Sequence, residues 1–108
     1  MDLTALRARM RVRLGTESAQ DDELNEILTT VADRICLRAG VAALPDALCS
    51  ICVDAGVKLW RRRCFEGVAS EGAGELTTAF ADDALAEYEP DLVRWRAANS
   101  ARNVVRLI

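Results

Sequence analysis

Residues 46–65 read DALCSICVDAGVKLWRRRCF, and this stretch decides the fold. One apolar stripe lies within about 60° of Leu48 on a helical wheel, and it contains Ile51, Cys52, Ala55 and Leu59. A second stripe, about 100–160° from Leu48, contains Cys49, Val53, Trp60 and Cys64. The polar arc is narrow and holds Ser50, Asp54, Lys58 and Arg61. A helix that is apolar over so much of its girth needs neighbours on two sides, so the stretch predicts the central helix of an α-helical protein.

Two further helices are expected before this stretch. In residues 2–14, apolar side chains recur at spacings of three and four: Leu3, Leu6, Met10 and Leu14. A second helix should begin in the acidic cluster at residues 20–23, because negative charge is favourable at a helix N-terminus. Its apolar stripe contains Leu24, Ile27, Leu28, Val31 and Ile35. Gly15 and Gly40 are the expected helix ends.

The chain after residue 67 is less regular. Gly72 and Gly74 interrupt any helix, and weak alternation follows them, so residues 68–81 are expected to form a loop or a small β-hairpin. Asp82 and Asp83 should begin a short helix that ends or restarts at Pro90 and continues to residue 98. Residues 99–108 have no clear period and are expected to be an extended tail. The predicted fold is therefore mainly α: a small antiparallel bundle of three to four main helices in one domain, residues 1–98, with a docking tail, residues 99–108.

Composition narrows the classes of protein. The chain has 108 residues, of which 51% are hydrophobic and 29% charged, so an intrinsically disordered chain is excluded. It has no histidine, which removes His-based catalytic triads and His metal ligands. No apolar run approaches the ~18 residues of a membrane-spanning helix, and the basic N-terminus lacks the apolar core of a secretory signal. No nucleotide-binding or nucleophile motif occurs, so we expect neither an enzyme nor a cofactor.

Charge is segregated along the chain. The net charge is +3 over residues 1–15, −6 over 16–33, +4 over 34–65, −8 over 66–91 and +4 over 92–108, and the total is −3. Such blocks offer complementary surfaces for head-to-tail self-association. The alternative is that the blocks pair within one chain or are simply solvated.

Three clusters of residues are candidate chemical sites. Cys49 and Cys52 form a C-x-x-C pair, which can bind a metal or act as a redox pair, but inside an apolar helix four buried cysteines acting as small hydrophobes are favoured. Residues 61–63 are all arginine and can bind phosphates, as can Arg7, Arg9, Arg11 and Arg13, or they can form a solvated face and inter-subunit ion pairs. The acidic residues at 82–91 can bind a metal or act in acid–base chemistry, but helix capping is favoured.

Several short motifs resemble a known family. The motifs are Leu59-Trp60-Arg61-Arg62-Arg63, Gly67, Ser70-Glu71-Gly72, Phe80-Ala81-Asp82-Asp83, Tyr88 and Leu92-Val93-Arg94-Trp95-Arg96. In these, and in the acidic start of a helix near Asp22, the chain resembles the small head–tail connector (adaptor) proteins of long-tailed double-stranded DNA phages. It departs from them in its loop at 72–79, which is less β-forming, and in Pro90, which interrupts the last helix.

The resemblance implies a structural protein of the virion, made in the host cytoplasm and located at the head–tail junction. Such proteins are helical bundles that form a ring, usually twelve-fold, below the portal protein. The ring extends the channel through which genomic DNA passes without sequence-specific binding, and it receives a stopper or tail-completion protein. The expected subunit interface contains Arg61, Arg62, Arg63, Glu71, Glu75, Phe80, Asp82 and Asp83. The residues expected to dock on the portal are Arg102, Val104, Val105, Arg106, Leu107 and Ile108.

Two other functions stay open at this point. One is a small helical nucleic-acid-binding regulator that uses residues 7–13 or 61–63 on phosphates, although the net charge of −3 and the lack of interleaved aromatic residues speak against it. The other is a metal or redox protein built on Cys49 and Cys52.

Overall fold

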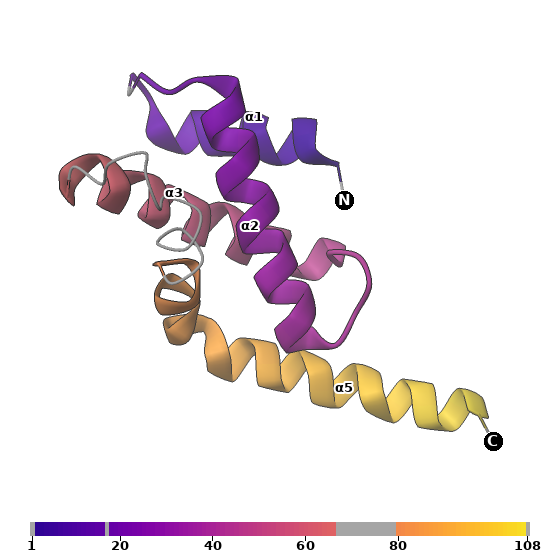
Figure 1. Ribbon diagram of the computed structural model, residues 1–108. Helices are drawn as coiled ribbons and strands as arrows, with labels where there is room; N and C mark the ends of the chain where they lie inside the picture. Colours follow the sequence, from indigo (N-terminus) through magenta and orange to yellow (C-terminus); the bar gives the residue numbers. More distant parts are fainter. Residues whose placement is uncertain (1, 17, 67–79, 108) are drawn as a thin grey trace.

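The computed structural model describes residues 2–16, 18–66 and 80–107, which are mostly helical (Figure 1). The elements are α1 (Leu3–Leu14), α2 (Asp21–Ala39), the 3-10 turn η1 (Asp46–Leu48), α3 (Cys49–Glu66), a short helix at residues 80–85, the 3-10 turn η2 (Ala86–Tyr88) and α5 (Glu89–Leu107). None of the described residues lies in a β-strand. The predicted class, a mainly α small helical bundle, is confirmed.

The first two helices begin and end where the sequence predicts. At the start of α1, Asp2 Oδ1 accepts a hydrogen bond from the Ala5 backbone N–H at 3.2 Å, which satisfies one of the free donors of a helix N-terminus. At the start of α2, the Gln20 backbone N–H donates to Glu23 Oε1 at 3.4 Å. Gly15 and Gly40 follow the two helices with positive φ angles of 65° and 72°, which only glycine adopts without strain.

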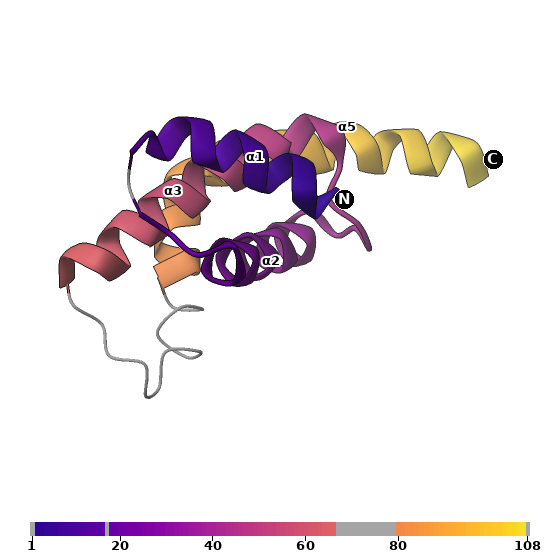
Figure 2. The ribbon, with the colours of Figure 1, turned by 90° about the horizontal axis from the view of Figure 1, so that it is seen from above.

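The helices cross rather than align as a uniform antiparallel set. Figures 1 and 2 show α1 and α3 running in the same direction, with α2 crossing both. Two hydrogen bonds show that α1 and α3 are parallel. Arg9 Nη2 donates to Ser50 Oγ at 2.9 Å near the start of α3, and Arg61 Nη2 donates to the Arg13 carbonyl at 3.4 Å further along it. The segment 80–88 runs antiparallel to α3, since Asp83 pairs with Arg62 near the end of α3 and Tyr88 binds Asp54 nearer its start. This segment therefore covers the side of α3 that α1 and α2 leave open.

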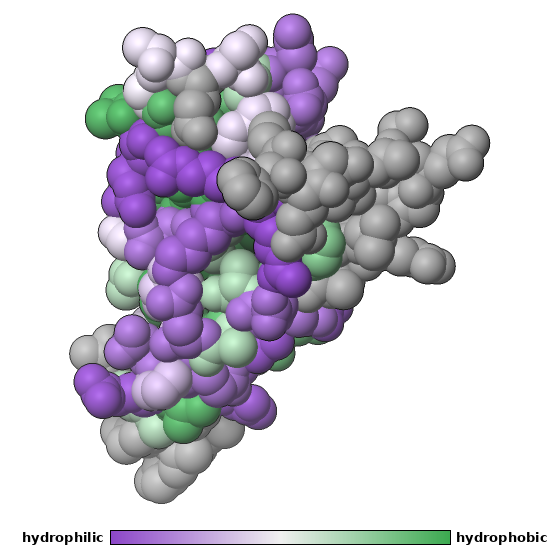
Figure 3. Space-filling view, turned by 90° about the vertical axis from the view of Figure 1, so that its left-hand side faces the viewer, coloured by the Kyte–Doolittle hydropathy of each residue, from purple (hydrophilic) through white to green (hydrophobic). Residues whose placement is uncertain are grey.

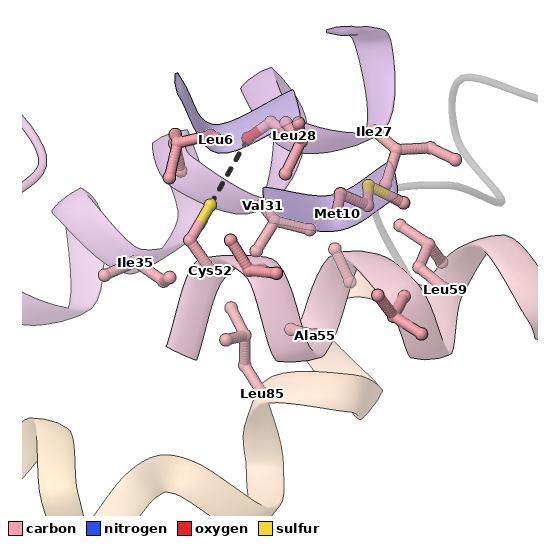
Figure 4. Packing of buried hydrophobic residues seen from close by; sticks show 14 of the residues in the cluster. Leu6, Met10, Ile27, Leu28, Val31, Ile35, Cys52, Ala55, Leu59 and Leu85 are labelled. Atoms are coloured by element: carbon pink, nitrogen blue, oxygen red, sulfur yellow. Dashed lines mark hydrogen bonds between the residues drawn. The ribbon is translucent and has the colours of Figure 1, made fainter. Parts of the chain in front are cut away.

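The core confirms the predicted stripes. The five stripe residues of α2 are completely buried. In η1 and α3 the buried stripe residues are Leu48, Cys52, Ala55, Leu59, Val53 and Trp60, whereas Cys49 and Ile51 are half-buried and the side chain of Cys64 lies outside the described residues. Figure 4 shows side chains from α1, α2 and α3 pointing toward one another, with Leu85 approaching α3 from the opposite side. The labelled members of this cluster are Leu6, Met10, Ile27, Leu28, Val31, Ile35, Cys52, Ala55, Leu59 and Leu85. As predicted, α3 is the central helix.

Gly56 lies where α3 packs tightly against α1 and α2. A Cβ atom at this position would lie 3.3 Å from Leu28 Cδ2 and 3.6 Å from Met10 Sδ. Ordinary van der Waals contact starts near the upper of these distances, so a larger side chain has no room here. The wheel of α3 did not single out this residue, because a glycine between apolar neighbours carries no hydrophobic signal.

The C-terminal half differs from expectation in two places. Residues 68–79 of the predicted loop or hairpin lie outside the described residues, while residues 80 and 81 are helical. Residues 99–107 continue α5 as helix, so the expected extended conformation is wrong, and the boundary expected after residue 98 lies inside this helix. The reason is that no glycine or proline follows Pro90, so nothing stops the helix that restarts there. Figures 1 and 2 show the last turns of α5 projecting beyond the bundle.

Candidate functional site

The segment that follows the undescribed residues is fixed to α2 by ion pairs. The Arg34 guanidinium donates two hydrogen bonds to the Asp82 carboxylate, from Nε to Oδ1 at 2.8 Å and from Nη2 to Oδ2 at 3.1 Å. Arg38 lies one turn further along α2 and donates to Asp82 Oδ1 at 3.4 Å and to Glu89 Oε2 at 2.6 Å. The hydrogen bond from Arg34, with smaller contributions from Arg38, lowers the pKa of Asp82 below its ordinary value. A forked arginine–carboxylate contact also fixes orientation, so it sets where residues 80–89 lie.

A second polar network joins η2 to α3 and α1. The Tyr88 hydroxyl donates to Asp54 Oδ2 at 2.8 Å and accepts from Lys58 Nζ at 3.0 Å. Lys58 also pairs with Glu87, and Arg13 of α1 pairs with Asp54. The hydrogen bond from Tyr88 is the main reason that the pKa of Asp54 is lowered, whereas burial raises the pKa of Tyr88 itself. The network is a structural clamp between three elements.

Arg62 connects the end of α3 to the short helix at residues 80–85. Its guanidinium pairs with Asp83, and its Cζ lies 4.2 Å from the centroid of the Phe80 ring, which is a cation–π geometry. Figure 3 views the molecule from the left-hand side of Figure 1 and shows a broad hydrophilic band with smaller hydrophobic areas. Among the described residues of this face, the hydrophobic areas are separated by hydrophilic ones.

Five residues of the expected subunit interface can be located: Arg61, Arg62, Phe80, Asp82 and Asp83. Four of them contact one another or α2 within the chain, as described above. The acidic residues at 82–89 thus form ion pairs with basic residues of α2 and α3 in the same chain. This is the intramolecular pairing that the sequence left open for the charge blocks. The remaining expected interface positions, Glu71, Glu75 and the side chain of Arg63, lie outside the described residues.

The expected portal-docking residues lie at the end of α5. The backbone of Arg102, Val104, Val105, Arg106 and Leu107 is helical. Their side chains, and the whole of Ile108, are outside the described residues. The structure thus places five of the six docking positions on the projecting end of one helix.

The arginines of α1 are engaged within the chain. Arg7 Nη1 donates to Asn25 Oδ1 at 3.0 Å, and its Nε lies 3.7 Å from Asp21 Oδ1. Arg11 also pairs with Asp21, and this hydrogen bond is the main reason that the pKa of Asp21 is lowered. With the bonds of Arg9 and Arg13 to α3 given above, all four arginines link α1 to its neighbours. They serve the packing of α1 in this structure.

Two oppositely charged surfaces have no such partners. On α2, Asp22, Glu26 and Asp33 are exposed, and on α5, Arg94 and Arg96 are exposed. Among the described residues, none of these five makes an ion pair within the chain. The charge blocks of the sequence do not tell which of their residues stay unpaired in the folded chain. The spacing of the three acidic residues, four and then seven, was the signal that they share one face of α2.

The described cysteines are free thiols: Cys36, Cys49 and Cys52. Cys52 is buried, its Sγ donates to the Leu28 carbonyl at 3.7 Å (Figure 4), and burial raises its pKa to about 12. Such a thiol stays protonated near neutral pH and packs as a small apolar group. Within the described part of the chain, no three potential His, Cys, Asp or Glu ligands are arranged for a metal ion, and no helix has the length and apolarity to cross a membrane.

Comparisons with known proteins give no relative. The chain matches no protein-family model, no curated protein and no solved structure. Its function therefore has to be inferred from its own residues.

Proposed function

We propose that this chain is a head–tail connector subunit of a tailed phage or phage-derived particle, a structural protein rather than an enzyme. Its copies form a ring, usually twelve-fold in the family it resembles, below the portal protein. The ring extends the DNA channel and presents a surface to a stopper or tail-completion protein. The proposal locates the chain in the virion, at the junction of head and tail.

The observation that carries the proposal is the run of motifs from Leu59 to Arg96 in a small helical bundle. The contacts of these motifs support it. Phe80 and Asp83 contact Arg62 of the arginine run, and Asp82 is gripped by Arg34. Two of the motifs that carry the resemblance, residues 59–63 and 80–83, are therefore in contact in the folded chain.

The projecting end of α5 supplies the docking element of the proposal. It combines apolar and basic residues, from Arg102 to Ile108, and a helix that protrudes from its bundle can enter a groove of a partner through one apolar face. We propose the portal protein as that partner. The DNA in the channel would meet acidic side chains, which do not adhere to phosphates.

Particle composition tests the proposal. The amount of this polypeptide is measured against the portal protein in purified virions, and the head–tail junction is imaged in particles made without it. We expect a fixed ratio near one to one, and DNA-filled heads without tails when the chain is missing. Absence of the polypeptide from particles that carry tails normally would contradict the connector function.

A nucleic-acid-binding regulator is the second candidate. The feature in its favour is α5, which has four arginines and no acidic residue after Asp91. The arginines of α1 give it no support, because they bind Asp21, Asn25 and the polar residues of α3. Duplex DNA affinity measured over a range of salt distinguishes the two: a regulator shows a steep loss of affinity with salt, and a connector shows no appreciable affinity at physiological salt.

A further inference from the structure

The exposed face of α2 carries an acidic stripe, defined here as Asp22, Glu26 and Asp33. The three positions lie within about 40° of one another on the helix and span about 16 Å along it. All three side chains are exposed. Asp21, next to the stripe, is already paired with Arg7 and Arg11. The chain's own basic residues thus reach the flank of this face and leave the stripe itself without a counter-charge among the described residues.

The complementary surface is on α5. From Leu92 to Leu107 this helix has four arginines and no acidic residue. Arg94 and Arg96, whose side chains are described, are exposed and make no ion pair with another described residue. Figures 1 and 2 show the later turns of this helix leaving the bundle.

The two surfaces cannot meet within one chain. α5 starts beside the C-terminal end of α2, where Arg38 holds Glu89 at 2.6 Å, and a Cβ on Gly40 would lie 3.8 Å from Arg96 Nε. From there it runs away from α2, whereas the stripe extends toward the opposite end of that helix (Figure 1). The basic helix of one molecule can therefore reach an acidic stripe only on another molecule.

Exposed apolar side chains accompany both surfaces. Leu37 continues the α2 stripe by one turn and is 69% exposed, and Val93 precedes Arg94 on α5 and is 56% exposed. These are two of the three large hydrophobic side chains most exposed among the described residues. A contact that pairs the charges and also covers these two side chains removes apolar area from water, which charge pairing alone does not do.

We propose that the first turns of α5 in one copy, at Val93, Arg94 and Arg96, dock on the acidic stripe of α2 in the next copy. The contact uses two different surfaces of the same chain, so it is heterologous and repeats from copy to copy, as a ring requires. This inference rests on the proposed function and names the subunit contact of its ring. It assigns that contact to α2 and α5, whereas residues 62, 82 and 83 hold the subunit itself together.

Charge reversal on each side tests the contact. Variant A carries Asp22→Lys, Glu26→Lys and Asp33→Lys, and variant B carries Arg94→Glu and Arg96→Glu. In A alone the stripe and residues 94 and 96 are all basic, and in B alone they are all acidic, so each variant should be monomeric. In an equimolar mixture every contact again joins opposite charges. Sedimentation velocity of the full chain at up to about 1 mM, the concentration at which weak contacts become populated, measures association.

We expect the wild-type chain to associate at low salt, with affinity falling about tenfold between 50 and 500 mM NaCl. A and B should each lose association, and their mixture should recover it. A matched control, Asp46→Lys, reverses an exposed acidic residue outside both the stripe and α5 and should associate as wild type. Circular dichroism of each variant confirms that it is folded.

Several results would overturn the inference: a wild-type chain that stays monomeric throughout, a variant A or B that associates as wild type, or a mixture that stays monomeric. The particle experiment separates this failure from that of the connector function. If virions contain the chain but any of these results is obtained, the connector function is supported and the proposed subunit contact is wrong. If the mixture of A and B recovers association but virions lack the chain, the subunit contact is supported and the connector function is wrong.

Discussion

Gly56 has a role that depends on having no side chain. Leu28 and Met10 approach the position of its missing Cβ to 3.3 and 3.6 Å. We therefore expect Gly56→Leu to reduce the free energy of unfolding by about 3 kcal/mol, since overpacking forces the three helices apart. Gly56→Ala is the matched control. Its gain in helix propensity, about 1 kcal/mol, offsets the tight Cβ contact, so its stability should stay within about 1 kcal/mol of wild type. Urea unfolding measures both, and equal stability of the two variants would contradict the close crossing.

Tyr88 acts through its hydroxyl, which bridges Asp54 and Lys58. Tyr88→Phe keeps the ring and removes the bridge, and we expect a loss of about 1 kcal/mol in unfolding free energy. The pKa of Asp54 should rise toward its ordinary value of 3.8, because the hydrogen bond from Tyr88 is the largest cause of its lowering. NMR titration of the Asp54 carboxyl follows this change. A titration identical to that of wild type would show that Arg13 and Lys58 hold the carboxylate without the hydroxyl.

At the scale of elements, the short helix at residues 80–85 depends on Asp82. Arg34 and Arg38 lower the pKa of this carboxyl below 3.8 in the folded chain. Its contribution to stability is therefore complete above that pH and is lost as the pH falls through the folded-state pKa. Both Asp82 and Arg34 side chains are 34% exposed, so solvent screening limits the contribution to about 1 kcal/mol.

Asp82→Asn should accordingly loosen this element. Amide hydrogens of residues 80–85 should exchange about fivefold faster at neutral pH, the equivalent of about 1 kcal/mol in local opening. At a pH well below 3.8 the difference from wild type should disappear, because Asp82 is then protonated in both folded and unfolded states. Asp91→Asn, at an exposed acidic residue without a partner among the described residues, is the control and should leave exchange unchanged. Exchange in Asp82→Asn equal to wild type at neutral pH would show that apolar packing alone holds residues 80–85.

The helices and their buried faces could be predicted from sequence because they follow from local spacing. The stripes at three and four residues in α1, α2 and α3 identify the core, and Gly15 and Gly40 mark helix ends. The continuation of α5 to Leu107 was missed, since its last turns have no bundle to face and therefore no apolar period. The sequence also could not tell which charged residues pair. Asp82 and Arg34 are 48 positions apart, and only the folded chain brings them together.

At the scale of the whole molecule, the end of α5 projects from the bundle. A deletion there should therefore affect docking but not the stability of the fold. Deleting residues 104–108 removes the apolar end of a helix that has already left the bundle (Figure 2), so the thermal unfolding midpoint should change by less than about 2 °C. Incorporation into particles should be lost, because the truncation removes the segment proposed to enter the portal. The truncated chain is produced during infection in place of the wild type, and its ratio to the portal protein in purified virions is measured. Val12→Ser, at a residue of α1 that is 81% exposed, is the control for loss of an apolar side chain elsewhere and should be incorporated normally. Incorporation of the truncated chain at the wild-type ratio would rule out docking through this segment, and the portal contact would then have to lie on the bundle itself.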